Sequence, residues 1–140
     1  MKNEYMKIAI EQAKKAYKTN NTPVGCVIVF KNSIIAKSYN KKNSKNNAIY
    51  HAEILSIFKA CKKLKSWYLN ECEMYVTLKP CNMCYGAINE ARISKVYYIL
   101  DSNYYMNMNY NIGDNIYVKV DDKFQYSTLL STFFKNKRNL

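Results

Sequence analysis

Residues 74–100 read MYVTLKPCNMCYGAINEARISKVYYIL, and the order of elements in this segment is the basis of the fold prediction. The β-branched and aromatic residues of 74–78 predict a strand, and Pro80 soon after it is suited to the first turn of a helix. Apolar residues at helical spacing over 81–92 predict that helix, and 95–100 predicts another strand. The segment is therefore expected to form a strand, a helix and a strand in succession.

The rest of the chain extends this alternation. Before the segment we expect a helix over 4–17, a hairpin of strands 24–30 and 34–39, a surface loop over 40–47 and a helix over 51–65. After it we expect a strand over 116–120 and a helix capped by Asp121 or Asp122, with repeating apolar residues Phe124, Leu129/Leu130 and Phe133/Phe134. Residues 101–115 follow neither period and are expected to be irregular. This order implies a three-layer α/β domain with a mixed central sheet of about five strands.

Length and composition limit the class of protein. The chain has 140 residues, 49% of them hydrophobic, which suffices for one core and not for two, so 1–140 is expected to be a single domain. Its apolar runs are too short to cross a bilayer, and no secretory segment is expected. Five cysteines, an odd number, argue against a disulfide framework and for a reducing compartment, so we expect a cytoplasmic protein.

The charge balance favours an anionic partner such as nucleic acid. Lys and Arg number 22 against 10 Asp and Glu, which gives a net charge of +12. Compositional drift is an alternative source of part of this charge, because 20 of the basic residues are Lys. Lys41, Lys42 and Lys45 in the predicted surface loop could contact phosphate, but a solvated lysine-rich loop is the expected interpretation.

Two short motifs carry the chemistry, and each lies at the start of a predicted helix. They are His51-Ala52-Glu53 and Pro80-Cys81-Asn82-Met83-Cys84. Cysteines at positions i and i+3 can direct both sulfurs toward one ion, and His51, the only histidine, can supply a third ligand. Three protein ligands leave a fourth position for water, as in catalytic zinc sites, although Cys26, Cys61 or Cys72 could fill it. A structural zinc site and a redox C-x-x-C pair are the alternatives.

Glu53 is the expected proton carrier of such a site. If the only histidine binds the metal, a carboxylate has to move the protons. The pattern H-x-E followed by P-C-x-x-C is the signature of the zinc-dependent nucleoside deaminases, in which an activated water attacks the amine-bearing carbon of the base.

Beyond these motifs, the chain resembles the bacterial-type tRNA-specific adenosine deaminases, within the cytidine and deoxycytidylate deaminase superfamily, over nearly its whole length. The matching stretches are Pro23–Gly25, Tyr50–Ile54, Tyr75–Leu78, Pro80–Cys84, Ala91–Ile93 and Leu129–Phe134. The last of these resembles the tRNA-acting branch in particular, because free-base and nucleotide deaminases share the H-x-E and P-C-x-x-C core.

The resemblance implies a fold, an activity and partners. It implies a cytidine-deaminase-like three-layer α/β/α fold, a homodimer with one Zn²⁺ in each subunit, and deamination of the wobble adenosine of a tRNA anticodon to inosine. It implies that His51, Cys81 and Cys84 bind zinc and that Glu53 is catalytic. Among substrate-binding positions, Asn40 matches the residue that holds the flipped base and its sugar, and Ala52 matches the backbone group facing the base edge. Phe134 and Arg138 match the helix that contacts the anticodon loop.

Two departures from the family pattern keep other functions open. Lys79 stands where the family usually has Glu, and residues 101–113 replace a loop that normally shapes the substrate groove, so RNA contacts there are not transferred. Asn40 could also simply cap a turn. The alternatives are a small-molecule deaminase acting on guanine, cytosine or a deoxynucleotide, and an inactive zinc-stabilised RNA-binding protein.

Overall fold

The computed structural model describes residues 2–101 and 116–138. Its elements, in chain order, are α1 (Lys2–Lys18), β1 (Gly25–Phe30), β2 (Ser33–Tyr39), α2 (Ala52–Leu64), β3 (Cys72–Leu78), α3 (Asn82–Ala91), β4 (Lys95–Leu100), β5 (Tyr117–Lys119) and α4 (Tyr126–Arg138). The predicted irregular stretch lies, from residue 102 onward, outside the described residues. Among the described residues, no helix is long and apolar enough to span a membrane.

The strands form one mixed sheet in the order β2-β1-β3-β4-β5. β1 pairs antiparallel with both β2 and β3, whereas β3, β4 and β5 run parallel to one another. Because β3 and β4 are parallel and α3 connects them, α3 has to cross one face of the sheet. The carboxyl end of β3 therefore delivers the Pro80–Cys84 motif to one edge of the sheet.

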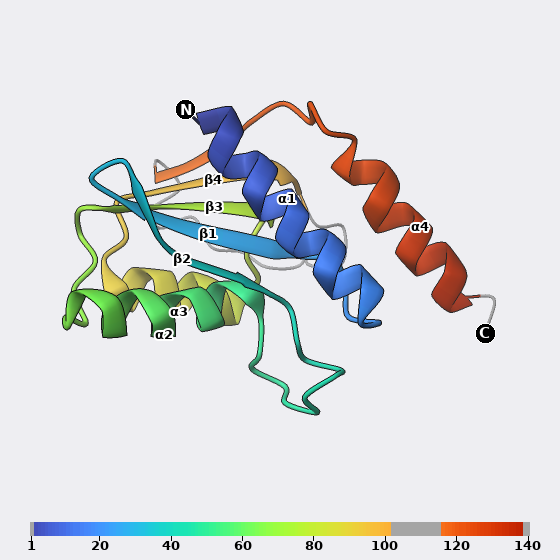
Figure 1. Ribbon diagram of the computed structural model, residues 1–140, viewed down its shortest axis with the longest axis horizontal. Helices are drawn as coiled ribbons and strands as arrows, with labels where there is room; N and C mark the ends of the chain where they lie inside the picture. Colours follow the sequence, from blue (N-terminus) through green and yellow to red (C-terminus); the bar gives the residue numbers. More distant parts are fainter. Residues whose placement is uncertain (1, 102–115, 139–140) are drawn as a thin grey trace.

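Helices cover both faces of the sheet, as Figure 1 shows. α1 and α4 lie over one face, and α2 and α3 lie side by side under the other. The central strands β1 and β3 are buried between these layers: Cys26, Val27, Ile28, Met74 and Val76 have no exposed surface. This arrangement confirms the predicted three-layer α/β/α fold with a mixed five-stranded sheet.

A close approach between α1 and β1 depends on Gly25. A Cβ atom at this position would lie 1.8 Å from the carbonyl oxygen of Ala9 and 2.6 Å from the backbone nitrogen of Ala13. Only glycine lets the helix backbone come so near the strand. The Pro23-Val24-Gly25 stretch thus fixes how α1 sits on the sheet.

The helix boundaries differ from the predictions by one or two residues in α1, α2 and α3, and the start of α4 was also placed too early. α2 and α3 begin one residue later than expected, so His51 and Cys81 are N-cap residues with extended backbone. The placement of Phe124 in the last helix is wrong, because α4 begins at Tyr126. The carboxylate of Asp122 accepts hydrogen bonds from the backbone nitrogens of Tyr126 (2.7 Å) and Ser127 (2.9 Å), which fixes the first turn beyond Phe124. Asp122 is thereby confirmed as a cap.

Candidate metal centre and substrate pocket

Three side chains converge where α2 and α3 begin. The Nδ1 atom of His51 lies 3.6 Å from the Sγ atom of Cys81 and 3.6 Å from that of Cys84. All three donor atoms lie within 4.8 Å of one another. The extended backbone of the two cap residues turns their side chains toward the space between the helix ends, while Cys84 reaches the same space from the first turn of α3. The fold thus brings His51 next to two cysteines that lie about 30 residues later in the chain, the farther one 33 residues away.

The spacing of these atoms fits a zinc ion. Tetrahedral zinc with Zn–N near 2.0 Å and Zn–S near 2.3 Å places nitrogen and sulfur about 3.6 Å apart. The observed distances are 3.6 Å. Within the described part of the chain this is the one group of three histidine, cysteine or acidic side chains close enough to bind a metal, and it includes none of the other cysteines. Two sulfurs and one imidazole leave the fourth tetrahedral position open, as in catalytic sites.

The side chains of His51, Cys81 and Cys84 also share protons through hydrogen bonds, and this arrangement favours the binding of a divalent cation. Hydrogen bonds from Cys84 and His51 lower the pKa of the Cys81 thiol to about 4. The same hydrogen bond with Cys81, together with burial, raises the pKa of Cys84. The hydrogen bond with Cys81 raises the pKa of His51. A cation that replaces the shared protons satisfies all three groups at once, because thiolate and neutral imidazole are the forms that bind metal.

Glu53 lies buried beside this group, in the first turn of α2. Only 4% of the residue is exposed, and burial raises the pKa of its carboxyl to about 7. A carboxyl that titrates near neutral pH can both accept and release a proton, which is what general acid–base catalysis requires. A buried ionisable group in a pocket is also typical of a functional site.

A pocket opens over the metal-binding group. It is lined by residues from four separate segments of the chain: Thr22, Val24, Asn40, Lys42, His51, Ala52, Glu53, Leu78, Lys79 and Cys81. The predicted site residues Asn40, His51, Ala52, Glu53 and Cys81 thus meet at one place, with Cys84 behind them. The apolar walls, which come from Val24 and Leu78, are contributions that the two metal-site motifs did not indicate.

Asn40 takes one of its two expected roles, that of a turn cap, and its contact with the base and sugar stays a prediction. Its Oδ1 atom accepts a hydrogen bond from the backbone nitrogen of Lys42 (2.8 Å), so it caps a turn. Its own backbone nitrogen donates to the carbonyl oxygen of Val24 (3.1 Å), which ties it to the start of β1. The residue is 7% exposed and lines the pocket, and its amide nitrogen is the group left to face a ligand.

The loop that follows Asn40 is held by Asn21, which lies between α1 and β1. Asn21 has no exposed surface. Its Oδ1 atom accepts hydrogen bonds from the backbone nitrogens of Asn43 (2.8 Å) and Ser44 (3.0 Å), and its Nδ2 atom donates to Oγ of Ser44 (3.0 Å). No local pattern signals this contact, because its partners are more than 20 residues away.

The two predicted RNA-contacting residues belong to α4, and Phe134 is not one of the residues that line the pocket. Phe134 is half-buried, with its ring centroid 5.5 Å from that of Phe133, and Phe133 is buried against Tyr17 as expected of a core residue. The side chain of Arg138 lies outside the described part of the structure. Their contact with RNA stays a prediction.

Comparison with known proteins gives one consistent family. Residues 1–100 match the family model for the cytidine and deoxycytidylate deaminase zinc-binding region. The tRNA-specific adenosine deaminase of Aquifex aeolicus is 38% identical over 99% of this chain and 97% of its own length. That of Buchnera aphidicola subsp. Baizongia pistaciae is 37% identical over 97% of this chain and 90% of its own length.

Solved structures point the same way. A structure from a study of A-to-I editing by tRNA:A34 deaminases at the wobble position is 37% identical and covers 71% of this chain and 77% of its own, with a TM-score of 0.70. The guanine deaminase of Bacillus subtilis is 27% identical and covers 99% of this chain and 94% of its own, with a TM-score of 0.69. The fold is therefore shared by enzymes that act on tRNA and by enzymes that act on a free base.

Proposed function

This chain belongs to the cytidine and deoxycytidylate deaminase family and, within it, to the tRNA-specific adenosine deaminases, and from this premise we propose that it converts the wobble adenosine of a tRNA anticodon to inosine. The observation that carries the proposal is the pocket in which Glu53 lies buried beside the group of His51, Cys81 and Cys84. The tRNA anticodon stem-loop is the partner. The near-full-length similarity to tRNA-acting relatives favours this substrate over a free base.

Zinc is the cofactor, and His51, Cys81 and Cys84 are the residues that would hold it. When bound, zinc lowers the pKa of water and so supplies a nucleophile near neutral pH. The positive ends of α2 and α3, where two of these residues cap the helices, offset part of the negative charge of the two thiolates.

Glu53 carries the protons of the reaction. Hydrolysis adds the oxygen of water to C6 of adenine and breaks the bond between C6 and the exocyclic nitrogen, which leaves as ammonia. Glu53 takes the proton of the attacking water, gives it to the ring nitrogen and then assists proton transfer to the leaving amine. Its burial keeps competing solvent away from this transfer.

The remaining site residues position the base. Asn40 binds the flipped nucleoside from the side of β1, and the backbone of Ala52 faces the base edge. Phe134 and Arg138 contact the anticodon loop from α4. Unstacked bases of an RNA loop fit such a site, because they can be splayed into a pocket and held by aromatic and basic side chains.

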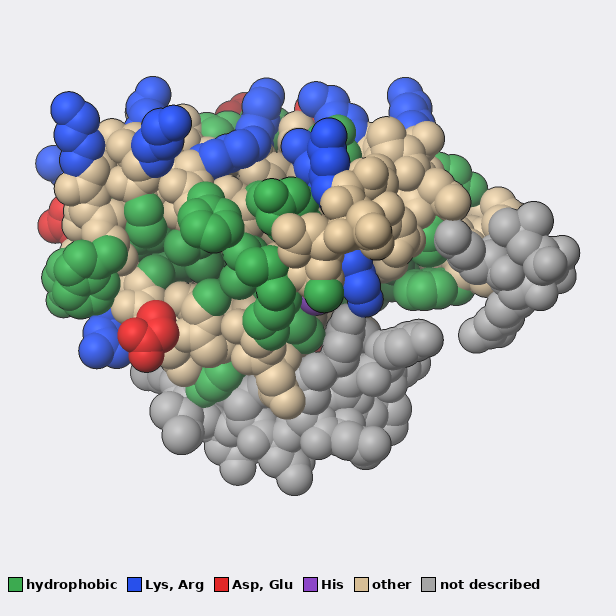
Figure 2. Space-filling view, turned by 90° about the horizontal axis from the view of Figure 1, so that it is seen from below, with side chains coloured by type: hydrophobic (Ala, Val, Ile, Leu, Met, Phe, Trp, Pro, Cys, Tyr) green, Lys and Arg blue, Asp and Glu red, His purple; other side chains and the backbone are tan. Residues whose placement is uncertain are grey.

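The active form is proposed to be a homodimer. Hydrophobic side chains are exposed on the face formed by α2 and α3, which Figure 2 views directly. The exposed apolar residues of these helices and of the connection after α2 are Phe58 (60% exposed), Trp67 (68%), Tyr68 (47%) and Met83 (37%). Soluble monomers rarely expose such a group together. Sedimentation equilibrium measures the mass: the dimer is expected, and a monomer at micromolar concentration would refute it.

We also propose that the protein works in the cytoplasm. All five cysteines are free thiols in the structure, which suits a reducing compartment. Cell fractionation followed by immunodetection tests the location.

The central experiment uses purified protein and a tRNA whose anticodon begins with adenosine, with inosine detected by sequencing. Conversion is expected, and Glu53→Ala should abolish it while keeping zinc. His51→Ala should lose zinc as well as activity, as measured by atomic absorption. If Glu53→Ala also emptied the site, the division of roles between ligand and proton carrier would be wrong.

Guanine deamination is the second candidate, because the guanine deaminase of Bacillus subtilis covers nearly the whole chain at 27% identity. Ammonia release from free guanine, with no inosine in tRNA, would favour it. Tight tRNA binding with neither activity would favour an inactive zinc-stabilised RNA-binding protein.

A further inference from the structure

Two lysines line the pocket from different segments of the chain. Lys42 comes from the loop after β2, and Lys79 comes from the end of β3. Adenine and guanine are uncharged near neutral pH and give neither lysine an anionic partner. The pocket therefore carries positive charge that the chemistry on the base does not use.

Lys79 is oriented by its neighbours. Its Nζ atom lies 5.6 Å from the ring centroid of Tyr98 and 4.0 Å from Oδ1 of Asp101. Asp101 binds Lys119 more closely, at 2.9 Å, and the hydrogen bond from Lys119 lowers the pKa of the Asp101 carboxyl. Asp101 thus contacts two ammonium groups, those of Lys79 and Lys119, and holds the Lys79 side chain at the end of β3 beside the pocket.

Lys42 is placed by its backbone. Its amide nitrogen donates to Asn40, the residue proposed to hold the target nucleoside, and Asn21 anchors the two residues that follow. The Lys42 side chain itself is exposed. Because its backbone is fixed next to the nucleoside site and its side chain lines the pocket, its ammonium group can reach groups that lie close to that nucleoside.

We propose that Lys42 and Lys79 bind the backbone phosphates that flank the target adenosine, and that these contacts make the enzyme prefer an RNA strand to a free base or nucleoside. The inference rests on the proposed function and names the part of the RNA that the pocket edge recognises. Phosphate contacts fix the register of a nucleic acid on a protein, whereas base contacts identify the nucleotide. A base flipped into the pocket brings its own two phosphates to the pocket edge, where the two lysines lie.

The test pairs protein variants with altered RNA. Lys42→Gln and Lys79→Gln are compared with wild type on an anticodon stem-loop and on stem-loops in which one flanking phosphate is replaced by an uncharged methylphosphonate. Each lysine variant should raise KM for the normal stem-loop by about three- to tenfold and lower the slope of log affinity against log salt by about 1. Each should lose little more when its own phosphate is already neutral, because the two changes remove the same contact.

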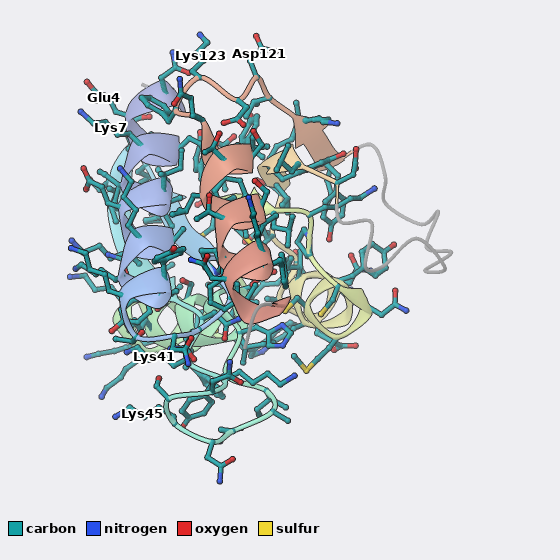
Figure 3. All side chains as sticks on the ribbon, turned by 90° about the vertical axis from the view of Figure 1, so that its right-hand side faces the viewer. Glu4, Lys7, Lys41, Lys45, Asp121 and Lys123 are labelled. Atoms are coloured by element: carbon teal, nitrogen blue, oxygen red, sulfur yellow. The ribbon has the colours of Figure 1, made fainter. Side chains whose placement is uncertain are left out.

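Matched controls separate a local contact from general charge. Lys45→Gln removes a charge from the same loop, and Lys123→Gln removes one at the other end of the molecule; Figure 3 shows Lys45 pointing outward from the loop and Lys123 at the opposite end. Both should leave KM near the wild-type value. Zinc content should stay unchanged in all variants.

The outcomes distinguish this inference from the proposed function. KM and salt slopes for Lys42→Gln and Lys79→Gln that match the controls would overturn the inference, as would additive losses with both methylphosphonates. If wild type leaves the stem-loop unmodified, the proposed function fails, and the salt dependence of stem-loop binding alone then decides whether the two lysines contact phosphate.

Discussion

At the scale of single residues, the pocket depends on side chains outside the metal-binding motifs. Asn21 is the clearest case, because it supports the loop that carries Asn40 and Lys42 without touching the pocket itself. The side-chain oxygen of Asn21 accepts hydrogen bonds from two backbone N–H groups of that loop, which would otherwise bind water. Buried side-chain amides of this kind are costly to remove, because the groups they satisfy are left without a partner.

Asn21→Ala is expected to destabilise the protein by about 2 kcal/mol, since it leaves the backbone nitrogens of Asn43 and Ser44 unpaired. Urea unfolding followed by circular dichroism measures the change. KM for the stem-loop should also rise, because the loop loses its anchor. Lys45→Ala, an exposed change in the same loop, should stay within about 0.5 kcal/mol of wild type; an equal effect of both would contradict the anchoring role.

At the scale of elements, the helix starts matter most. α2 and α3 each have a proposed ligand at the N-cap and another site residue within the first turn. The relative positions of the two helix N-termini therefore determine the distances between the site residues. α1 packs on the other face of the sheet. Its contact with β1 leaves no room for a side chain at residue 25.

Gly25→Ala is expected to cost about 3 kcal/mol or more, because the added Cβ would collide with backbone atoms of α1 that cannot move independently. Gly86→Ala is the matched control. It lies within α3, and an added Cβ there has no neighbour within 4 Å. It should stabilise the protein by about 0.5–1 kcal/mol through higher helix propensity. Free energies of unfolding in urea give both values, and a mild Gly25→Ala effect would refute the close approach.

The cap of α4 predicts a pH dependence. Although partial burial acts in the opposite direction, hydrogen bonds from the backbone nitrogens of Ser127 and Tyr126 lower the pKa of Asp122. A lowered pKa in the folded state gives stability that is present above the unfolded value of about 4 and is lost as pH falls through the folded value.

Asp122→Ala should therefore destabilise by about 1 kcal/mol at pH 7 and by less near pH 3. Unfolding curves at the two pH values test this, with Asp121→Ala as the exposed neighbouring control. A loss that grows as the pH falls would contradict the cap.

At the scale of the whole molecule, zinc joins parts of the chain that the sheet topology brings together. His51 and Cys81 are the N-cap residues of α2 and α3, Cys84 lies in the first turn of α3, and β3 lies between the two helices in the sequence. A ligand that binds only the folded state stabilises it in proportion to the logarithm of its concentration over its Kd.

Removal of zinc by a chelator is therefore expected to lower Tm by about 10 °C or more. Differential scanning calorimetry measures it, and Zn²⁺ but not Mg²⁺ should restore the transition because thiolates disfavour Mg²⁺. The chelator should leave Tm of the His51→Ala protein unchanged. If the chelator lowered the Tm of the wild-type and His51→Ala proteins equally, zinc would have to stabilise the protein by binding at another site.

Much of this protein follows from local sequence. Periodicity predicts α1, the hairpin, α2, the strand–helix–strand segment around Pro80 and the five-stranded mixed sheet, because each of these buries an apolar face with its own repeat. The two motifs indicate the zinc chemistry, since residue type and i, i+3 spacing suffice to direct two sulfurs to one ion. Phe124 was misplaced because the helix start is set by the Asp122 carboxylate and not by the apolar repeat.

Only the tertiary structure decided which residues surround that chemistry. Lys42 lines the pocket, and Asn21 supports the loop that carries it, through pairings between distant segments that their own sequence neighbourhoods do not signal. Lys79 lies two residues before Cys81, so the motif itself places it near the site. A sequence motif contains residues that lie together on one helix turn. The walls of a pocket come from separate segments of the chain, and the order of the strands decides which of these segments lie next to the motif. The sequence by itself determined the metal chemistry and the layers of the fold; the packing of β1, β3 and the loop after β2 determined the shape and charge of the pocket.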